Sequence, residues 1–281
     1  MSVPEYLDGA SGRLEVRTVE SRTEARRADL LFVHGAWSSS WYWESFFLPW
    51  FAERGFRCRA LSLQGHGGSE GKVRWTSILD YVEDVRVAAG NLDRPILIGH
   101  SMGGYIAQKY ASLYPVRGLG LMASVAPGGV WETLFKVIRE RPVAFLRTIG
   151  TLDLYGIVAK RETARSLLFS RDPSRTDKDH FLRHLQSESF RAFLDMLFLP
   201  VRKTSINGAP VTVIGAELDQ IISKENVEAT ARFHGVRPIL LPMASHMVPV
   251  DDRWREAATA LEAWIARDVL FQNSPDPAAP N

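Results

Sequence analysis

Short runs of continuous apolar residues recur along the chain, separated by segments in which apolar positions have helical spacing. The runs occupy residues 30–33, 56–63, 96–98, 119–124, 211–214 and 238–241. Continuous runs of this length are typical of strands buried on both faces. Residues 78–89 and 254–269 show the periodicity of amphipathic helices. The alternation predicts an α/β fold with a mostly parallel, doubly wound sheet covered by helices on both faces.

One long segment breaks this alternation. Residues 128–205 show helical periodicity without a convincing strand, as in Phe193, Leu194 and Leu197. We therefore predict a helical cap inserted after the sixth strand, between a first part of the core at 1–127 and a second part at 206–270. The polar, proline-rich end, residues 271–281, is predicted to be disordered.

Composition places the chain among ordinary globular proteins. Of its 281 residues, 46% are hydrophobic and 23% are charged, and the net charge of +2 is too small to indicate a nucleic-acid partner. Cys58 is the single cysteine, which excludes an intrachain disulfide and a cysteine-rich metal site. No apolar run approaches the ~20 residues of a membrane span, and the first residues do not resemble a signal peptide. We expect a soluble, cytoplasmic protein.

The segment Gly99-His-Ser101-Met-Gly103 follows a predicted strand and precedes a helix-like stretch. A serine at the tip of a tight strand-to-helix turn takes a strained backbone conformation, and the glycines two residues before and after it leave room for the turn. The serine side chain then stands clear of the sheet, beside the first amides of the helix. We predict that Ser101 is a catalytic nucleophile.

A serine hydroxyl needs a base within hydrogen-bond reach, and the base needs a third group that orients it. His246 follows the last predicted strand, so it is expected at the same sheet edge as Ser101. Asp219 follows the preceding strand and satisfies the chain order nucleophile, acid, base. Glu217, on the same turn, is the alternative acid. The sequence therefore predicts a triad of Ser101, Asp219 and His246.

Another pair of histidines, His180 and His184, raises the alternative of a metal site. His180 and His184 have the i, i+4 spacing of a helical ligand pair, with Asp177 and Asp179 nearby. The intervening residues lack the glutamate of the metalloprotease pattern, so a solvated face of a cap helix is the better interpretation. We expect no metal.

A tetrahedral oxyanion also requires amide donors. The amide of Met102 begins the helix after Ser101 and is expected to point into the site. The second donor is expected in the loop after residues 30–33, where the amide of Ala36 is the first candidate and that of Trp37 the alternative.

Together these motifs resemble the capped α/β-hydrolase superfamily. The segments that carry the resemblance are His34-Gly-Ala-Trp37, Gln64-Gly-His-Gly-Gly-Ser69, Gly99-His-Ser-Met-Gly-Gly104, Gly215-Ala-Glu-Leu-Asp219 and Ser245-His-Met247. The resemblance spans about residues 28–268, and the chain is similar to bacterial esterases and lysophospholipase-like proteins with a single cap. Many members of this superfamily have arginine at the position of Gln64, so the polar contacts of this loop are expected to differ here. Epoxide hydrolases and haloalkane dehalogenases have an aspartate nucleophile, so Ser101 argues against both.

The resemblance implies hydrolysis of a carboxylic ester through an acyl-enzyme on Ser101, without a cofactor. The expected partner is a small hydrophobic ester with an apolar acyl or aromatic group. The same triad serves lactone, thioester and carbon–carbon bond hydrolysis or perhydrolysis, and a slow-turnover small-molecule binding protein is a further alternative. Aromatic residues of the oxyanion side and of the cap are expected to line the substrate pocket: Trp37, Trp41, Trp131, Phe135 and Phe193.

Overall fold

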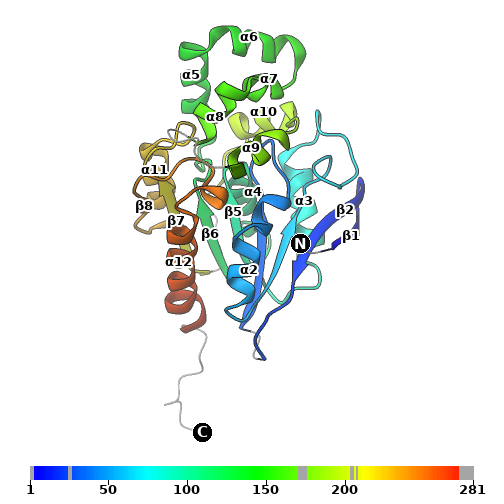
Figure 1. Ribbon diagram of the computed structural model, residues 1–281, viewed down its shortest axis with the longest axis vertical. Coiled ribbons are helices and arrows are strands. Elements are labelled where there is room, and N and C mark those ends of the chain that lie inside the picture. The colour runs from blue at the N-terminus through cyan, green and yellow to red at the C-terminus, as the bar shows by residue number, and fades with distance from the viewer. Residues whose placement is uncertain (1–2, 25–26, 170–175, 203–205, 207, 272–281) are drawn as a thin grey trace.

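The computed structural model describes residues 3–24, 27–169, 176–202, 206 and 208–271. Within these residues one eight-stranded sheet has the order β1-β2-β4-β3-β5-β6-β7-β8 (Figure 1). The strands are β1 (Pro4–Gly9), β2 (Gly12–Val19), β3 (Ala28–Val33), β4 (Phe56–Leu61), β5 (Ile96–His100), β6 (Gly118–Met122), β7 (Val211–Ala216) and β8 (Ile239–Leu241). Strands β3 to β8 pair parallel with one another, whereas β1 pairs antiparallel with β2 and β2 pairs antiparallel with β4. The predicted mostly parallel α/β sheet is confirmed.

Helices cover both faces of the sheet, because its central strands are apolar on both sides. Every residue of β3, β5 and β6 is buried. One buried cluster joins the sheet to α3, α4 and α11, and a second joins it to α1, α2 and α12. The helices outside the cap are α1 (Trp41–Glu44), α2 (Phe47–Ala52), α3 (Ile78–Ala89), α4 (Met102–Ala111), α11 (Lys224–His234), the 3₁₀ turn η1 (Val248–Val250), α12 (Trp254–Trp264) and its π-helical continuation η2 (Ile265–Leu270).

Between β6 and β7 the chain forms helices that lie beyond one end of the sheet (Figure 1). They are α5 (Trp131–Glu140), α6 (Pro142–Thr151), α7 (Tyr155–Val158), α8 (Arg161–Phe169), α9 (Thr176–Arg183) and α10 (Phe190–Phe198). These helices follow the sixth strand and are called the cap helices below, whereas the bounds of a cap at 128–205 stay a prediction. The end segment 272–281, for which the sequence predicts disorder, lies outside the described residues.

The hairpin of β1 and β2 is absent from the sequence prediction. No residue of its first strand is buried, and in the second strand only Leu14, Glu15 and Val16 are buried. Such an edge hairpin lacks the continuous apolar run on which the prediction of the other strands depends. No helix in the part of the chain that the structure describes is both long and apolar enough to cross a membrane.

Candidate active site

Ser101 occupies the sharp turn between β5 and α4. Its backbone has φ 55° and ψ −122°, a conformation that L-residues rarely adopt. The amide of Ser101 donates to the Met122 carbonyl of the neighbouring strand at 3.1 Å, which holds the turn on the sheet. A side chain at Gly103 would collide with the carbonyl oxygens of Val33 and His34, so glycine is required for this close approach.

His246 lies between Ser101 and Asp219. Its Nε2 is 3.1 Å from the Ser101 Oγ, and its Nδ1 is 2.8 Å from the Asp219 Oδ2. The other carboxylate oxygen of Asp219 accepts hydrogen bonds from the amides of Ile221 and Ile222, at 2.8 and 2.9 Å. Backbone donors thus fix the carboxylate, and the carboxylate fixes the imidazole. The structure brings together the three side chains that the sequence predicts as a triad.

Glu217, the alternative acid, points elsewhere. Its carboxylate accepts a hydrogen bond from the Met243 amide at 2.9 Å, on the exposed side of the turn. The geometry therefore favours Asp219 over Glu217 as the partner of His246.

His100, the residue before Ser101, contacts the backbone of His246. Its Nε2 lies 2.8 Å from the His246 carbonyl oxygen, and its Nδ1 lies 3.2 Å from the Tyr42 hydroxyl. Burial lowers the pKa of His100 well below its ordinary value, so the ring is neutral. A neutral ring that donates from Nε2 accepts from Tyr42, whose oxygen in turn accepts the Gly35 amide at 3.0 Å. One chain of hydrogen bonds thus connects the loop of Gly35 to the loop of His246.

Glu188 of the cap contacts the loop that follows β3. The Trp37 amide donates to the Glu188 Oε2 at 3.3 Å, and the Tyr81 hydroxyl donates to the Glu188 Oε1 at 3.1 Å. The backbone of Trp37 has a φ of 63°. The amide of Trp37 is thereby engaged, while Ala36 lines the cavity beside Ser101 and Met102 begins α4. A lone glutamate in the cap belongs to no motif, so no sequence signal identifies this contact.

His66 completes the surroundings of Glu188, with its Nε2 3.2 Å from the Glu188 Oε2. Burial by itself lowers the pKa of His66, but the charge and hydrogen bond of Glu188 outweigh it and the net pKa is raised. Burial likewise acts to raise the pKa of Glu188, and His66 reverses that effect. Each side chain thus shifts the pKa of the other toward its charged form, and this buried pair joins the cap helices to the core.

Asp84 of α3 is a second buried carboxyl near this loop. It accepts the Gln64 amide at 2.8 Å, and burial raises its pKa to about 7 against the opposing effect of the Gln64 hydrogen bonds. Gln64 stands where many relatives of the resembled superfamily carry arginine, so here no guanidinium at this position stabilises the charged form of Asp84.

Asp84→Asn is expected to remove a pH dependence of folding stability. Because the native pKa is about 7 and the ordinary value is 3.8, the native state keeps a proton that the unfolded state loses. Stability then falls as pH rises from about 4 to 7 and levels off above, by about 3 kcal/mol between pH 5 and pH 8. Urea unfolding of both proteins at these two pH values measures this. Parallel pH profiles for wild type and Asp84→Asn would contradict the assignment.

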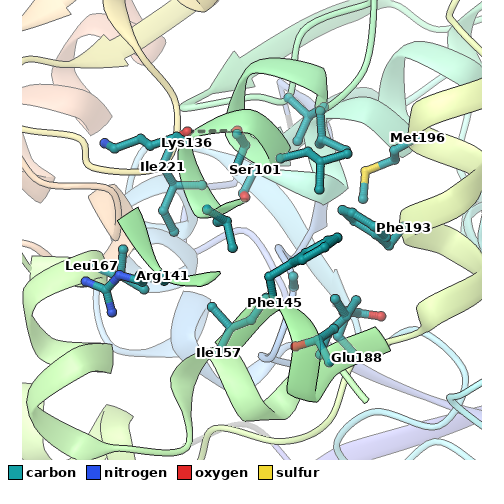
Figure 2. A pocket seen from close by; sticks show the side chains of 18 of the residues that line it. Ser101, Lys136, Arg141, Phe145, Ile157, Leu167, Glu188, Phe193, Met196 and Ile221 are labelled. Carbon is teal, nitrogen blue, oxygen red and sulfur yellow. Dashed lines mark hydrogen bonds between the residues drawn. The ribbon is translucent and has the colours of Figure 1, made fainter. Parts of the chain in front are cut away.

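A cavity of about 120 Å³ lies between Ser101 and the cap helices. Figure 2 shows Phe145 and Phe193 reaching into the same space as the Ser101 side chain. The lining is mostly aliphatic or aromatic, and further members are Leu134, Val137, Ile157, Leu167, Met196 and Ile221. A lining of this character favours an apolar group over a polar one.

Of the five predicted pocket aromatics, Trp37 and Phe193 line this cavity and the other three do not. Trp41 packs instead against Phe181, with ring centroids 5.5 Å apart. Trp131 and Phe135 lie on the exposed side of α5. The prediction that these three line the pocket is corrected accordingly, because composition identifies aromatic residues but not the helix face that each one occupies.

The rings of His180 and His184 lie 4.2 Å apart against Trp41. The side chains of Asp177 and Asp179 are outside what the structure describes. Within the described residues, no three histidine, cysteine, aspartate or glutamate side chains are placed to hold a metal ion.

The chain resembles known hydrolases over most of its length. Residues 30–260 match the family described as Alpha/beta hydrolase family. Monoacylglycerol lipase of Mycolicibacterium smegmatis is 29% identical over 185 residues, which cover 61% of this chain and 63% of that protein. A 2-hydroxy-6-oxononadienedioate/2-hydroxy-6-oxononatrienedioate hydrolase of Paraburkholderia phymatum is 32% identical over 119 residues, or 40% of this chain and 41% of that protein. The match thus spans less than two thirds of these curated relatives.

The fold is also that of solved hydrolase structures. A thermophilic esterase from Thermogutta terrifontis superposes with a TM-score of 0.72 and 21% identity, over 95% of this chain and 100% of that one. At this identity the likeness establishes the fold alone.

Proposed function

The chain belongs to the alpha/beta hydrolase family, and on that premise we propose that it is a serine hydrolase of carboxylic esters with an apolar acyl or aromatic group. The observation that carries the proposal is the placement of the Ser101 hydroxyl, 3.1 Å from the His246 Nε2, at an apolar cavity. A hydroxyl alone is a weak nucleophile, and this contact supplies the base that it needs.

The mechanism follows from the order of contacts. The Ser101 Oγ attacks the ester carbonyl while His246 takes its proton, and Asp219 stabilises the imidazolium without taking the proton itself. The amides of Met102 and Ala36 stabilise the oxyanion. His246 then gives the proton to the alcohol oxygen. The alcohol departs, and the acyl group remains bound to the Ser101 Oγ. Water, deprotonated by His246, attacks that acyl group, and the returning proton restores the Ser101 hydroxyl.

The engaged amide of Trp37 supports Ala36 as the second oxyanion donor. The Trp37 amide already donates to the Glu188 Oε2. If this amide instead bound an oxyanion, the buried Glu188 carboxylate would lose a hydrogen bond. Ala36 lines the cavity beside Ser101, on the side where the carbonyl oxygen of a bound ester is expected.

The experiment that tests the function is the specificity constant kcat/KM over nitrophenyl esters from acetyl to dodecanoyl. We expect hydrolysis with an optimum beyond the shortest ester, because the cavity lining is mostly apolar and extends from Ser101 to the cap helices. Phe193→Ala is expected to lower kcat/KM for the preferred esters by roughly tenfold, since Phe193 lines the cavity.

Phe198→Ala is the matched control, because Phe198 is on the same helix but exposed and outside the cavity. It should leave the series unchanged. Absence of hydrolysis of every ester in the series would overturn the ester assignment and favour carbon–carbon bond hydrolysis or a slow-turnover binding protein.

A further inference from the structure

Helices α5 and α6 form the end of the cap that is farthest from the sheet (Figure 1). None of the ten residues of α5 is fully buried. The inward side of these helices contributes Leu134, Val137 and Phe145 to the cavity. Large apolar side chains on their other sides, with Phe198 of α10, are exposed and define the outer cap surface: Trp131, Phe135, Ile138, Val143, Leu146 and Phe198.

Side chains of the outer cap surface are mostly exposed, and its three aromatic rings are contiguous. Phe135 is 64% exposed, Leu146 68% and Val143 78%. The ring of Trp131 lies 6.2 Å from that of Phe135 and 5.7 Å from that of Phe198, measured between centroids. Single exposed apolar residues are normal on proteins, whereas a contiguous aromatic and aliphatic patch marks a surface that meets an apolar partner.

The charges of these helices indicate the kind of partner. Residues 131–151 contain four basic and two acidic residues. Arg139 and Arg147 lie outside the cavity lining with Glu132, and Arg139 pairs with Glu140, whereas Lys136, Arg141 and Glu140 line the cavity. Helices that combine tryptophan, phenylalanine and leucine with basic residues bind at the interface of bilayers that contain anionic lipids. A second copy of this chain would bring the same positive charges face to face, which disfavours self-association.

We propose that the outer cap surface docks on a lipid bilayer with anionic headgroups, and that a hydrophobic ester enters the cavity from that bilayer. The same two helices present one side to the cavity and another to the outside, which places the proposed docking surface next to the cavity. The entry step rests on the proposed esterase function, whereas the docking step does not depend on it.

Sedimentation of the full chain with phosphatidylcholine–phosphatidylglycerol vesicles tests the docking step. Phe135→Ser combined with Leu146→Ser should weaken binding at least about tenfold, because two large apolar side chains no longer enter the interface. The matched control replaces Leu79 and Leu113, which are also exposed but lie outside the cap, by serine and should bind like wild type. Arg139→Gln with Arg147→Gln should weaken binding by roughly fivefold per charge, and only when the vesicles are anionic.

Hydrolysis provides the second readout. The Phe135→Ser/Leu146→Ser variant should cleave a dissolved short-chain nitrophenyl ester at the wild-type rate, since neither residue lines the cavity, and should lose activity on a long-chain ester held in vesicles. Failure of the wild type to bind vesicles, or equal loss in the Leu79/Leu113 control, would overturn the docking proposal. A wild-type dimer that only the cap variant separates, without vesicle binding, would overturn it in favour of self-association. Vesicle binding without ester hydrolysis would instead contradict the proposed function alone.

Discussion

Ser101→Ala should lower kcat for ester hydrolysis by at least about 10⁴-fold, because it removes the nucleophile on which both halves of the proposed mechanism depend. The residual rate is expected to come from substrate binding and the remaining oxyanion donors. The urea midpoint should change little, because the Ser101 side chain makes one hydrogen bond, to His246, while its backbone amide still holds the turn to Met122. Steady-state kinetics and urea unfolding of the purified variant measure both effects.

Ser112→Ala is the control for this substitution. Ser112 ends the same helix that Ser101 begins, and its hydroxyl donates to the Lys109 carbonyl at 2.7 Å, far from His246. It should retain wild-type turnover. Substantial activity in Ser101→Ala would remove Ser101 from the mechanism, whatever its geometry.

Asp219→Asn is expected to lower kcat by about 10⁴-fold with a wild-type KM. Asparagine retains an oxygen that accepts the amides of Ile221 and Ile222, so the turn is preserved. The amide group, however, donates toward the His246 Nδ1 and favours the tautomer with its proton on Nε2, which cannot accept the Ser101 proton. The loss should therefore appear in kcat, measured at saturating ester.

Glu217→Gln separates this effect from a general disturbance of the turn. Glutamine can still accept the Met243 amide, and Glu217 makes no contact with His246, so near wild-type kcat is expected. A larger loss of kcat in Glu217→Gln than in Asp219→Asn would show that Glu217, and not Asp219, is the acid.

The fold is largely predictable because buried parallel strands have a strong sequence signal. The predicted bounds of the helix Ile78–Ala89 match the structure, and this helix begins at a capping box of Ser77 and Asp80. The final strand begins one residue later than predicted, at Ile239. The edge hairpin of β1 and β2 has no such signal, since its residues face solvent at many positions. The closing helix also ends differently, because a π-helical segment follows Trp264.

The candidate site is predictable where it rests on motifs that follow strands. Ser101, Asp219 and His246 lie after β5, β7 and β8, whose carboxyl ends share one edge of the sheet, so the fold brings them together. Supporting residues are different. Glu188 and Tyr42 act through contacts between segments distant in sequence, which no local pattern records.

The orientation of aromatic residues is equally hidden. Trp43 and Phe47, near the oxyanion loop in sequence, are fully buried against Phe32 and form part of the core beneath the sheet rather than the pocket. Trp131 faces outward although it lies in the cap. An aromatic residue can belong either to the core or to a binding pocket, and the packing of the helices decides which of the two applies.

The central claim is that Ser101 is a nucleophile activated by His246. The most direct measurement is peptide mass mapping after reaction with an alkyl fluorophosphonate, which traps activated serines as stable esters. The account predicts a single adduct on the peptide that contains Ser101, and its loss in both Ser101→Ala and His246→Ala. An unlabelled Ser101 peptide, an adduct on another serine, or full labelling of Ser101 in His246→Ala would contradict it.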